Sequence, residues 1–433
     1  MSGRAFVLGG GVSGIAAGLA SGLQVLEAQE HPGGICRSYY VDEHGARHDR
    51  RPADRPAWRF ETGGGHWIFG DDPPVLGLLA RHARLRRHRR RAAVFLPDRG
   101  LLVPYPLQHH LRLLDSGTAA AALHELLRPK RPAATLAEWL EEQFGPTLCR
   151  LFFRPFHDLY TAGLTEEIAP QDPHKSPLDP RLVVRGALGE VEDVGYNVTF
   201  AYPEEGLDVL VDRLAARVRL ERGRRVRGID VAGRTVELAD GSRRPWDVLI
   251  STLPLDRTLE LAGLSTGEPP DPATSVLVAN IGAVRGPACP DVHWLYVPRS
   301  QAGFHRIGFY SKVDPGFLPR PDPALVSLYV ERAFPRGARP DAAAIRRWLD
   351  DVADELRGLG FVREVLVAAA DWIDTAYTWR RPGSRWREEA MDLLVRHRIF
   401  PVGRYARWHF QGILESVREG LAAGAALRAG LPA

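Results

Sequence analysis

The stretch that decides the fold is Gly9-Gly10-Gly11-Val12-Ser13-Gly14, followed by Glu27 and then by Pro32-Gly33-Gly34. Apolar runs at 5–8 and 23–26 predict two strands joined by a tight turn and a short helix of about nine residues. Glycines at such a turn let a pyrophosphate approach the helix N-terminus, where free N–H groups favour anions. Glu27, at the end of the second strand, is placed to accept hydrogen bonds from an adenosine ribose. The pattern therefore predicts a dinucleotide-binding unit.

Other interpretations of this stretch are open from sequence alone. Residues 6–26 carry no charged side chain, and glycine recurs at every fourth position from 10 to 22, as in packed membrane helices. Arg4 in front of the run also imitates a signal peptide. Against both, glycine is a poor helix former and no small-residue cleavage site is evident. An ordinary glycine loop is a further alternative, which Glu27 at the expected spacing disfavours.

The composition is that of a soluble globular protein with two or three domains. The chain has 433 residues, 45% of them hydrophobic and 25% charged, and a formal net charge of +4. The cysteines Cys36, Cys149 and Cys289 lack metal-like spacing, so we expect a cytoplasmic protein without a bound metal. The basic run at 81–91 lacks interleaved aromatic residues, which favours a solvated face over a nucleic-acid site. We expect no membrane partner, and the oligomeric state stays open.

Hydrophobic periodicity gives the remaining organisation of the chain. The pattern predicts helices within 118–164, at 207–214, 341–358 and 416–427, and strands at 92–96, 226–231, 235–238, 247–253, 275–281, 293–297, 305–310, 325–330 and 399–402. The dinucleotide unit is therefore discontinuous: it begins the chain, resumes near residue 205 and ends at the C-terminus. That layout suits a large flavin cofactor with other modules inserted.

Several segments in order along the chain resemble known flavoproteins. The residues that carry the resemblance are VLEA at 25–28 with HPGGICRS at 31–38, Phe60-Glu61 with Gly64-Gly65-His66, VPYPLQ at 103–108, FRPF at 153–156, Tyr296 ten residues before Arg306, and GRYARW at 403–408. The first resembles the amine-oxidase and protoporphyrinogen-oxidase superfamily, and the others resemble UDP-galactopyranose mutases more specifically.

The resemblance implies an α/β fold class in three parts. A discontinuous Rossmann-like FAD-binding domain would comprise residues 1–80, 203–262 and 396–433. A helical domain would be inserted at 108–185. An antiparallel β-sheet substrate domain would comprise 81–107, 186–202 and 263–395.

The resemblance also implies which residues contact FAD. These are Gly9, Gly11, Gly14 and Glu27 in the first unit, Gly33, Gly34, Arg37 and Ser38 beside the diphosphate and ribityl chain, Val226 at the adenine, Gly64, Gly65 and His66 beside the isoalloxazine, and Gly403, Arg404, Glu415 and Ser416 on its other side. Val226 and Ser38 also fit simple core and turn positions. His66 is expected to position the flavin rather than to act as an acid or base.

Substrate residues are implied with departures from the mutase pattern. Arg306 would grip a diphosphate with its planar fork and Tyr296 would stand nearby, although a surface ion pair is an alternative for Arg306. We assign Arg306, Tyr296 and His66 as catalytic, and Arg306, Tyr296, Arg381, Phe410 and Gln108 as substrate-binding. Phe410 and Leu414 stand where mutases present a tyrosine and an asparagine, and Arg381 replaces another tyrosine, so UDP-galactopyranose itself is doubtful as the substrate.

Three functions follow from these observations. The first is mutase-like chemistry on a sugar or nucleotide sugar, with N5 of reduced flavin as the nucleophile and NADPH or NADH as a candidate electron donor. The second is an FAD-dependent oxidoreductase that removes hydride from an alcohol or amine carbon. The third is a non-catalytic flavin-fold module. The fold alone does not decide between them.

Overall fold

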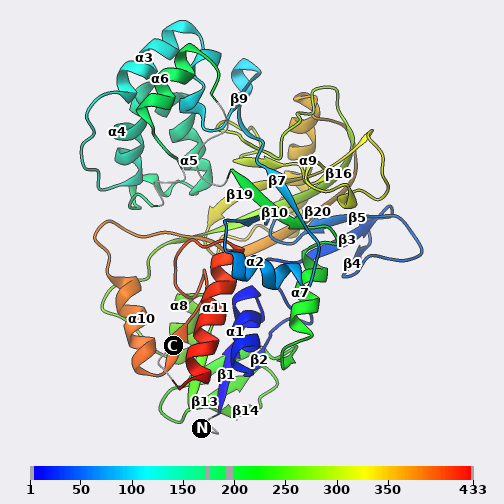
Figure 1. The fold of residues 1–433 in the computed structure, drawn as a ribbon, viewed down its shortest axis with the longest axis vertical. Coiled ribbons are helices and arrows are strands. Elements are labelled where there is room, and N and C mark those ends of the chain that lie inside the picture. The colour runs from blue at the N-terminus through cyan, green and yellow to red at the C-terminus, as the bar shows by residue number, and fades with distance from the viewer. Residues whose placement is uncertain (1–3, 172–175, 192–197, 431–433) are drawn as a thin grey trace.

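The computed structural model describes residues 4–171, 176–191 and 198–430. Figure 1 shows a layered α/β lobe at the bottom, a broad sheet across the middle and a cluster of helices at the top. The described chain begins in the bottom lobe at β1 (Ala5–Leu8) and ends there with α11 (Ile413–Arg428). The first and last described segments therefore share one lobe.

A parallel sheet forms the centre of the bottom lobe. Its order is β11 (Leu220–Glu221), β2 (Gln24–Leu26), β1, β15 (Val248–Ser251) and β21 (Ile399–Pro401). All four neighbouring pairs run parallel. Because successive side chains of a strand point to opposite faces, apolar runs in these strands supply two cores. Val7 faces the core that contains Ala17 and Ala423, whereas Leu8 faces the core that contains Trp246 and Trp386.

Helices and a small sheet cover the two faces of the parallel sheet. On one face α1 (Val12–Ser21) packs against α11 and α7 (Leu207–Ala215). The other core contains side chains of α8 (Leu255–Ala262), α10 (Trp386–Arg396) and the sheet of β12 (Val226–Asp230), β13 (Thr235–Leu238) and β14 (Arg243–Pro245).

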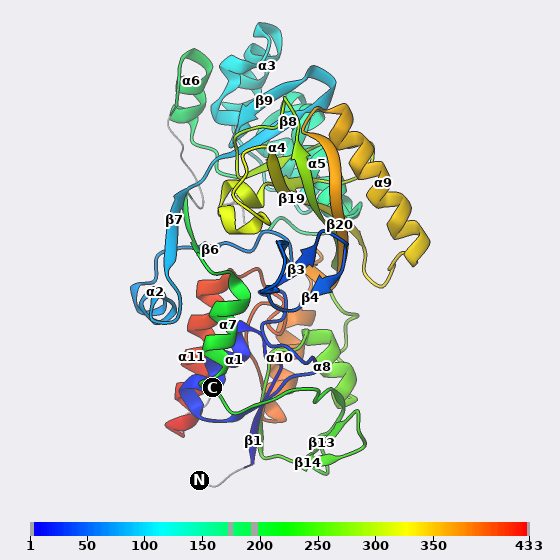
Figure 2. The same ribbon diagram turned by 90° about the vertical axis from the view of Figure 1, so that its right-hand side faces the viewer.

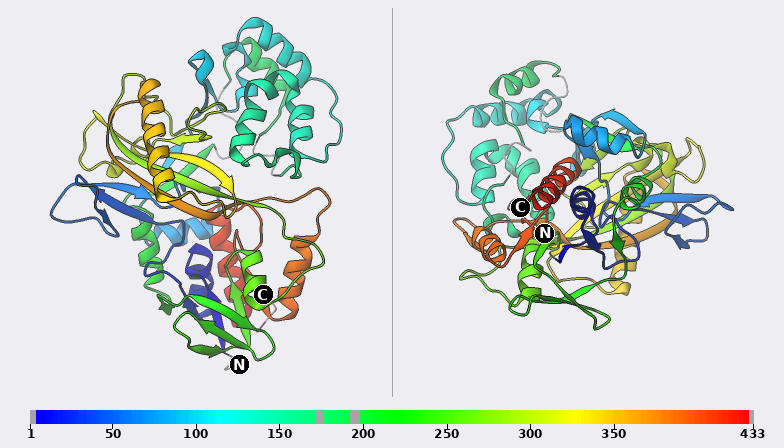
Figure 3. Two further views of the ribbon diagram at one scale, coloured as in Figure 1. Left: turned by 180° about the vertical axis from the view of Figure 1, so that it is seen from behind. Right: turned by 60° about the horizontal axis from the view of Figure 1, so that its bottom comes forward.

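Small residues let α1 and α11 lie in close contact (Figure 3, right). A Cβ on Gly420 would lie 2.2 Å from the carbonyl oxygen of Ser13, and one on Gly424 would lie 2.4 Å from that of Ala17. A Cβ on Gly14 would lie 1.9 Å from the carbonyl oxygen of Gly9. The glycine spacing that imitates a membrane helix has other causes: Gly14 belongs to the tight turn before α1, a Cβ on Gly18 would lie 2.5 Å from the side chain of Val218, and Gly22 ends α1 with a φ of +73°.

The middle of the molecule is a seven-stranded sheet. Its order is β20 (Val362–Thr378), β16 (Ala273–Arg285), β19 (Leu325–Pro335), β18 (Arg306–Gly308), β17 (Trp294–Tyr296), β8 (Ala92–Leu96) and β9 (Leu101–Pro104). Every neighbouring pair is antiparallel except β17 with β8. The helix α9 (Ala342–Gly358) covers the outer face, as Figure 2 shows.

Two small sheets and one short helix connect the lobes. One sheet has the order β6 (Ile68–Phe69), β10 (Thr199–Pro203) and β7 (Leu85–Arg89). The other has the order β4 (Arg47–His48), β3 (Ser38–Asp42) and β5 (Ala57–Glu61). The helix is α2 (Pro73–Ala80), whose first turn is capped by the Asp72 side chain.

The top lobe is helical and has its own core. It contains α3 (Ser116–Leu126), α4 (Leu136–Leu148), a π-helical turn at Cys149–Phe153, α5 (Arg154–Tyr160) and α6 (Pro180–Leu188). A capping box of Thr135 and Glu138 begins α4. Within the described residues, no helix is both long and apolar enough to cross a membrane.

The expected fold class is confirmed: a discontinuous parallel-sheet unit carries a helical insertion and a mainly antiparallel sheet. The residue boundaries that we assigned to the three domains stay predictions.

Candidate functional site

A cavity of about 400 Å³ runs along the carboxyl ends of the parallel strands. Its walls come from the β1–α1 turn, Glu27, the loop at 33–36, the loop at 63–67, the segment at 402–405 and the start of α11. The carboxyl edge of a parallel sheet is where open α/β sheets bind nucleotides. We call this space the cofactor cavity.

The glycine turn leaves room and hydrogen-bond donors on this cavity. A Cβ built on Gly11 meets no described atom within 4 Å, so the backbone there is open toward the cavity. Gly34 also lines the cavity, and its φ of +60° favours glycine. Gly11 caps α1 without a side-chain hydrogen bond, which leaves N–H groups of the first helical turn available to an anion. These features fit the diphosphate of a dinucleotide.

Glu27 is held at one end of the cofactor cavity. Its carboxylate accepts hydrogen bonds from the backbone N–H of Gly10 at 2.6 Å and of Gln29 at 2.7 Å. The backbone of Arg224 donates to the Glu27 carbonyl at 2.7 Å, which brings the start of β12 beside it. Val226 therefore lies close to this end through its strand, but its side chain joins the core behind the sheet.

A second cavity of about 230 Å³ lies between the middle sheet and the helical lobe. More than half of the residues that line it are aromatic: Trp67, Phe69, Tyr105, Trp139, Phe152, Phe156, Tyr160, Trp294, Tyr296, Tyr329, Tyr377, Trp379 and Phe410. The rings pack on one another; for example, the centroids of Tyr105 and Tyr296 are 5.0 Å apart. We call this space the aromatic cavity.

The two cavities meet. The residues that line both are Gly65, Trp67, Phe69, Arg306, Tyr377 and Phe410. A group bound in the cofactor cavity and a molecule bound in the aromatic cavity would therefore face each other across these side chains.

An ion pair between a partly exposed arginine and a buried glutamate stands at this junction. Nη2 of Arg306 donates to Oε1 of Glu331 at 2.6 Å, and Glu331 is almost wholly buried. Burial lowers the pKa of Arg306, but Glu331 outweighs it and holds that pKa well above its ordinary value. Burial likewise raises the pKa of Glu331, but Arg306 and His305 hold it at about 2. Both partners are charged at neutral pH.

His66 lines the cofactor cavity with a neutral ring. Burial, followed by the positive charge of Arg404, lowers its pKa to about 4. Nδ1 lies 3.3 Å from the carbonyl oxygen of Gly64. Its neutral state and this contact suit the positioning role that we expected.

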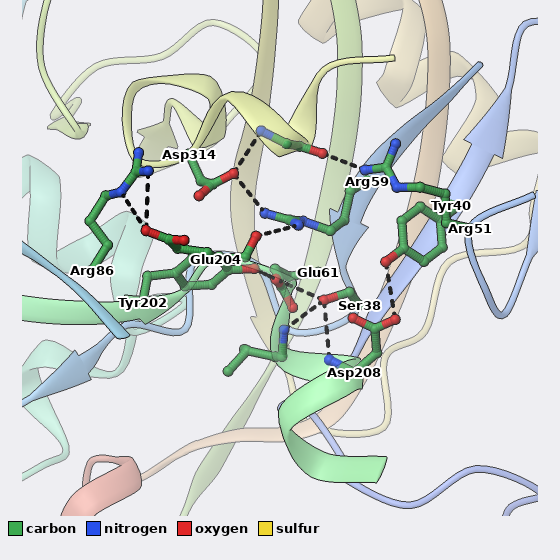
Figure 4. A network of polar contacts seen from close by, with 12 residues as sticks. Ser38, Tyr40, Arg51, Arg59, Glu61, Arg86, Tyr202, Glu204, Asp208 and Asp314 are labelled. Carbon is green, nitrogen blue, oxygen red and sulfur yellow. Dashed lines mark hydrogen bonds and ion pairs between the residues drawn. The ribbon is translucent and has the colours of Figure 1, made fainter. Parts of the chain in front are cut away.

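A polar network, shown in Figure 4, includes Glu61, which ends β5 just before the loop that carries His66. Ser38 Oγ donates to Oε1 of Glu61 at 3.0 Å and accepts from the backbone N–H of Leu207 at 3.1 Å, so it caps α7. The hydroxyl of Tyr202 also donates to Oε1 of Glu61. Burial raises the pKa of Glu61 to about 8, although Tyr202 and Arg59 lower it. The network joins β3, β5, β10 and α7.

Many of the predicted site residues come together around the two cavities. Gly9, Gly11, Glu27, Gly33, Gly34, Gly65, His66, Arg306, Gly403, Arg404, Phe410 and Ser416 line the cofactor cavity, and Tyr296, Arg306 and Phe410 line the aromatic cavity.

Other predicted contacts lie elsewhere. Gly14, Arg37, Ser38, Gly64, Val226, Gln108, Arg381 and Glu415 line neither cavity.

The hydrogen bonds of these side chains explain their positions. Arg37 donates to the carbonyl oxygens of Pro32 and Asp49, and Glu415 caps α11 by accepting from the N–H of Gly412 at 3.0 Å. Gln108 is buried and donates to the carbonyl oxygen of Pro177 at 2.5 Å.

Arg381 donates to the carbonyl oxygen of Pro270 on another surface.

Sequence reasoning missed several cavity residues. Glu331, Tyr329 and Tyr377 lie in long strands, and Thr252 follows β15. The sequence predicted only part of the strands that carry these residues. A tyrosine that faces a cavity also has the same place in the alternation of apolar residues as a tyrosine of the core. Only Glu331, an acid inside a buried strand, carried a signal that could have marked it.

A comparison with known sequences identifies the family. Residues 16–275 match the sequence profile of flavin-containing amine oxidoreductases. The chain belongs to this family. No curated protein sequence matches it. As a flavin-containing amine oxidoreductase it is a flavoenzyme, and the expected cofactor, FAD, is confirmed.

Solved structures show the same fold. Reduced UDP-galactopyranose mutase is similar with a TM-score of 0.85 and 20% identity over 99% of this chain and 94% of that chain. A CLA-producing fatty acid isomerase from P. acnes has a TM-score of 0.61 and 14% sequence identity, and the match covers 99% of this chain and 98% of that chain. A double mutant of putrescine oxidase has a TM-score of 0.60 and 16% sequence identity, and the match covers 99% of both chains. At these low sequence identities, the similarity shows a shared fold. It confirms the resemblance to mutase-like flavoproteins for the fold.

Proposed function

We propose that this flavoenzyme holds FAD in the cofactor cavity and acts by mutase-like chemistry on a sugar or nucleotide-sugar substrate in the aromatic cavity. The observation that carries the proposal is the junction of the two cavities, which would bring a substrate against the reacting end of the cofactor. When bound and reduced, the flavin would supply the nucleophile at N5. NADPH or NADH is the candidate source of electrons.

The protein's own residues would bind and orient both molecules. The N–H groups around Gly11 would hold the diphosphate of FAD, and Glu27 would hold the ribose. Arg306, fixed by Glu331, would offer its remaining N–H donors to an anionic or hydroxyl group of the substrate at the junction. The surrounding rings would exclude water and stack on a flat part of the substrate.

A spectrum of the purified protein and an anaerobic titration test this function. We expect a yellow, FAD-loaded protein. After reduction with dithionite, it should isomerise a candidate nucleotide sugar with no change of mass, as measured by mass spectrometry. A protein that purifies without flavin and cannot be loaded with FAD would refute the proposal.

A net oxidoreductase is the second candidate function, because the family consists of amine oxidoreductases. In that case, adding substrate should bleach the oxidised flavin and change the substrate mass by two hydrogens. Arg404, which lines the cofactor cavity without a carboxylate partner among the described residues, disfavours a protonated amine at the junction, because like charges repel in a desolvated site. An alcohol or another neutral substrate would suit this alternative better.

We also propose a cytoplasmic location. Cys36, Cys149 and Cys289 are buried and unpaired, which is typical of a reducing compartment. Separation of cells into cytoplasmic and membrane fractions would test this location, and we expect to detect the protein in the cytoplasmic fraction.

A further inference from the structure

We propose that Arg404 is the counter-charge for the anionic, reduced form of FAD, so that this site binds reduced FAD more tightly than oxidised FAD. The inference deepens the proposed function and rests on FAD occupying the cofactor cavity. It concerns a residue whose charge has a fixed position in the structure.

Three aromatic rings and one carbonyl group contact the side chain of Arg404. Its Nη2 donates to the carbonyl oxygen of Ala376 at 2.9 Å. Its Cζ lies 4.5 Å from the ring centroid of Phe410, 5.6 Å from that of Tyr377 and 5.5 Å from that of Tyr405. In the described part of the chain, no carboxylate lies within ion-pair distance of it. The rings and the carbonyl hold the guanidinium in place without neutralising it.

The other charges at this end of the cofactor cavity cancel or are absent. Arg306 and Glu331 form a pair with no net charge. His66 is neutral at pH 7, because burial and Arg404 together lower its pKa to about 4. Arg404 therefore leaves this end of the cavity with an excess positive charge.

Arg404 lies at the end where the reacting ring of a dinucleotide would be. Glu27 and Gly11 mark the opposite end, where the ribose and the diphosphate would bind. Tyr377 and Phe410, the rings that seat Arg404, line both cavities. The uncompensated charge is thus next to the junction with the aromatic cavity.

The charge of a flavin depends on its redox state. Oxidised flavin has a neutral ring; uptake of two electrons and one proton gives a reduced ring with one negative charge, and a second proton neutralises it. A fixed cation in a desolvated site stabilises the anion relative to the neutral forms. Arg404 would therefore raise the reduction potential of bound FAD.

The test measures the midpoint potential of bound FAD by dye-coupled reduction with dithionite. We expect Arg404→Met to lower the potential by about 30 mV for each tenfold loss of preference for reduced FAD, with a loss of tenfold or more. Arg404→Lys, which keeps a cation, should retain most of the wild-type potential. The matched control is Arg357→Met, because Arg357 is nearly half exposed and pairs with Asp354 on α9, away from both cavities; it should leave the potential unchanged.

A wild-type potential in Arg404→Met, or an equal fall in Arg357→Met, would overturn the inference. If Arg404→Met does not fold, the absorption spectrum of reduced FAD bound to the wild-type protein tests the inference instead. At pH 6, where free reduced flavin takes up its second proton, the bound reduced flavin should keep the absorption spectrum of the anion. The spectrum of the neutral reduced form would overturn the inference even though FAD is bound. Failure of the wild-type protein to bind FAD would instead refute the proposed function.

Discussion

Arg306 and Glu331 face each other from neighbouring antiparallel strands, with Nη2 and Oε1 2.6 Å apart where the two cavities meet. Glu331 lines only the cofactor cavity, whereas Arg306 lines both. His305 Nε2 lies 3.5 Å from the other carboxylate oxygen of Glu331. Glu331 thus fixes the guanidinium of Arg306 through one nitrogen, and Arg306 still lines both cavities.

Glu331→Gln should destabilise the protein. Removing one partner of a fully buried ion pair costs about 3–5 kcal/mol, and the cost here should be lower, about 1.5–3 kcal/mol, because 24% of the Arg306 side chain is exposed. Urea unfolding would measure the loss, and adding Arg306→Met should restore part of it, because the stranded charge is then gone. As a matched control, Glu260→Gln breaks an exposed pair with Arg257 and should change the stability by less than about 1 kcal/mol. Similar losses in the two single variants would contradict this account.

Gly11→Val should weaken FAD binding while leaving the fold intact. A side chain there has free space but occupies the cofactor cavity, and the backbone φ of −70° accepts any residue. We expect a loss on the order of 100-fold, about 2.7 kcal/mol, in titrations of the apoprotein with FAD. Gly77→Val, on the exposed side of α2, is the control and should bind FAD normally. Unchanged affinity in Gly11→Val would show that the diphosphate binds elsewhere.

His66 should stay neutral through the physiological range. Its imidazole NMR signal, assigned by comparison with His66→Asn, should titrate with a pKa of about 4. Arg404→Met should raise this pKa, because the positive charge of Arg404 is the second cause of its lowering after burial. A pKa above 6 in the wild-type protein would mean that the ring is more exposed than the structure shows.

The network around Glu61 should make stability depend on pH. The folded-state pKa of Glu61 is raised from 4.5 to about 8, so its contribution to stability is present below pH 4.5 and is lost as the pH rises toward 8. Oε2 of Glu61 is buried without a hydrogen-bond partner among the described residues, as suits a protonated acid. Glu61→Gln mimics that acid and should flatten the dependence of the melting temperature between these pH values.

The exposed acid Glu43 provides the control for this measurement. Glu43→Gln should keep the wild-type dependence of stability on pH, because Glu43 lies outside the buried network. If Glu61→Gln keeps the same slope as the wild-type protein, Glu61 is ionised in the folded state.

Local patterns predicted many elements closely. The strands expected at 92–96 and 235–238 have those bounds in the structure, and the helix expected from 341 begins at Ala342 after an Asp341 cap. The strand expected at 275–281 extends over Ala273–Arg285, because pairing with two neighbours continues it beyond the apolar run. The helix expected at 416–427 begins earlier, at Ile413, where Glu415 satisfies its first turn.

Side-chain roles were harder to predict than elements. Ser38 and Arg37 stand in the glycine-turn motif, but their hydrogen bonds go to Glu61, to the start of α7 and to nearby carbonyl groups. Val226 lies at the expected end of the cofactor cavity with its side chain in the core. A motif specifies the backbone path, whereas the partner of each side chain depends on segments far away in the sequence.

The sequence by itself determined one wall of the cofactor cavity, because the glycine turn, the helix start and Glu27 at the next strand end depend on contacts among residues 9–27. Only the tertiary structure decided the aromatic cavity, since its rings come from segments between Trp67 and Phe410. It also decided that Arg306 is paired with Glu331 while Arg404 is not paired with a carboxylate in the described structure. Charge compensation depends on distance in space, and residues that are close in the fold here are far apart along the chain.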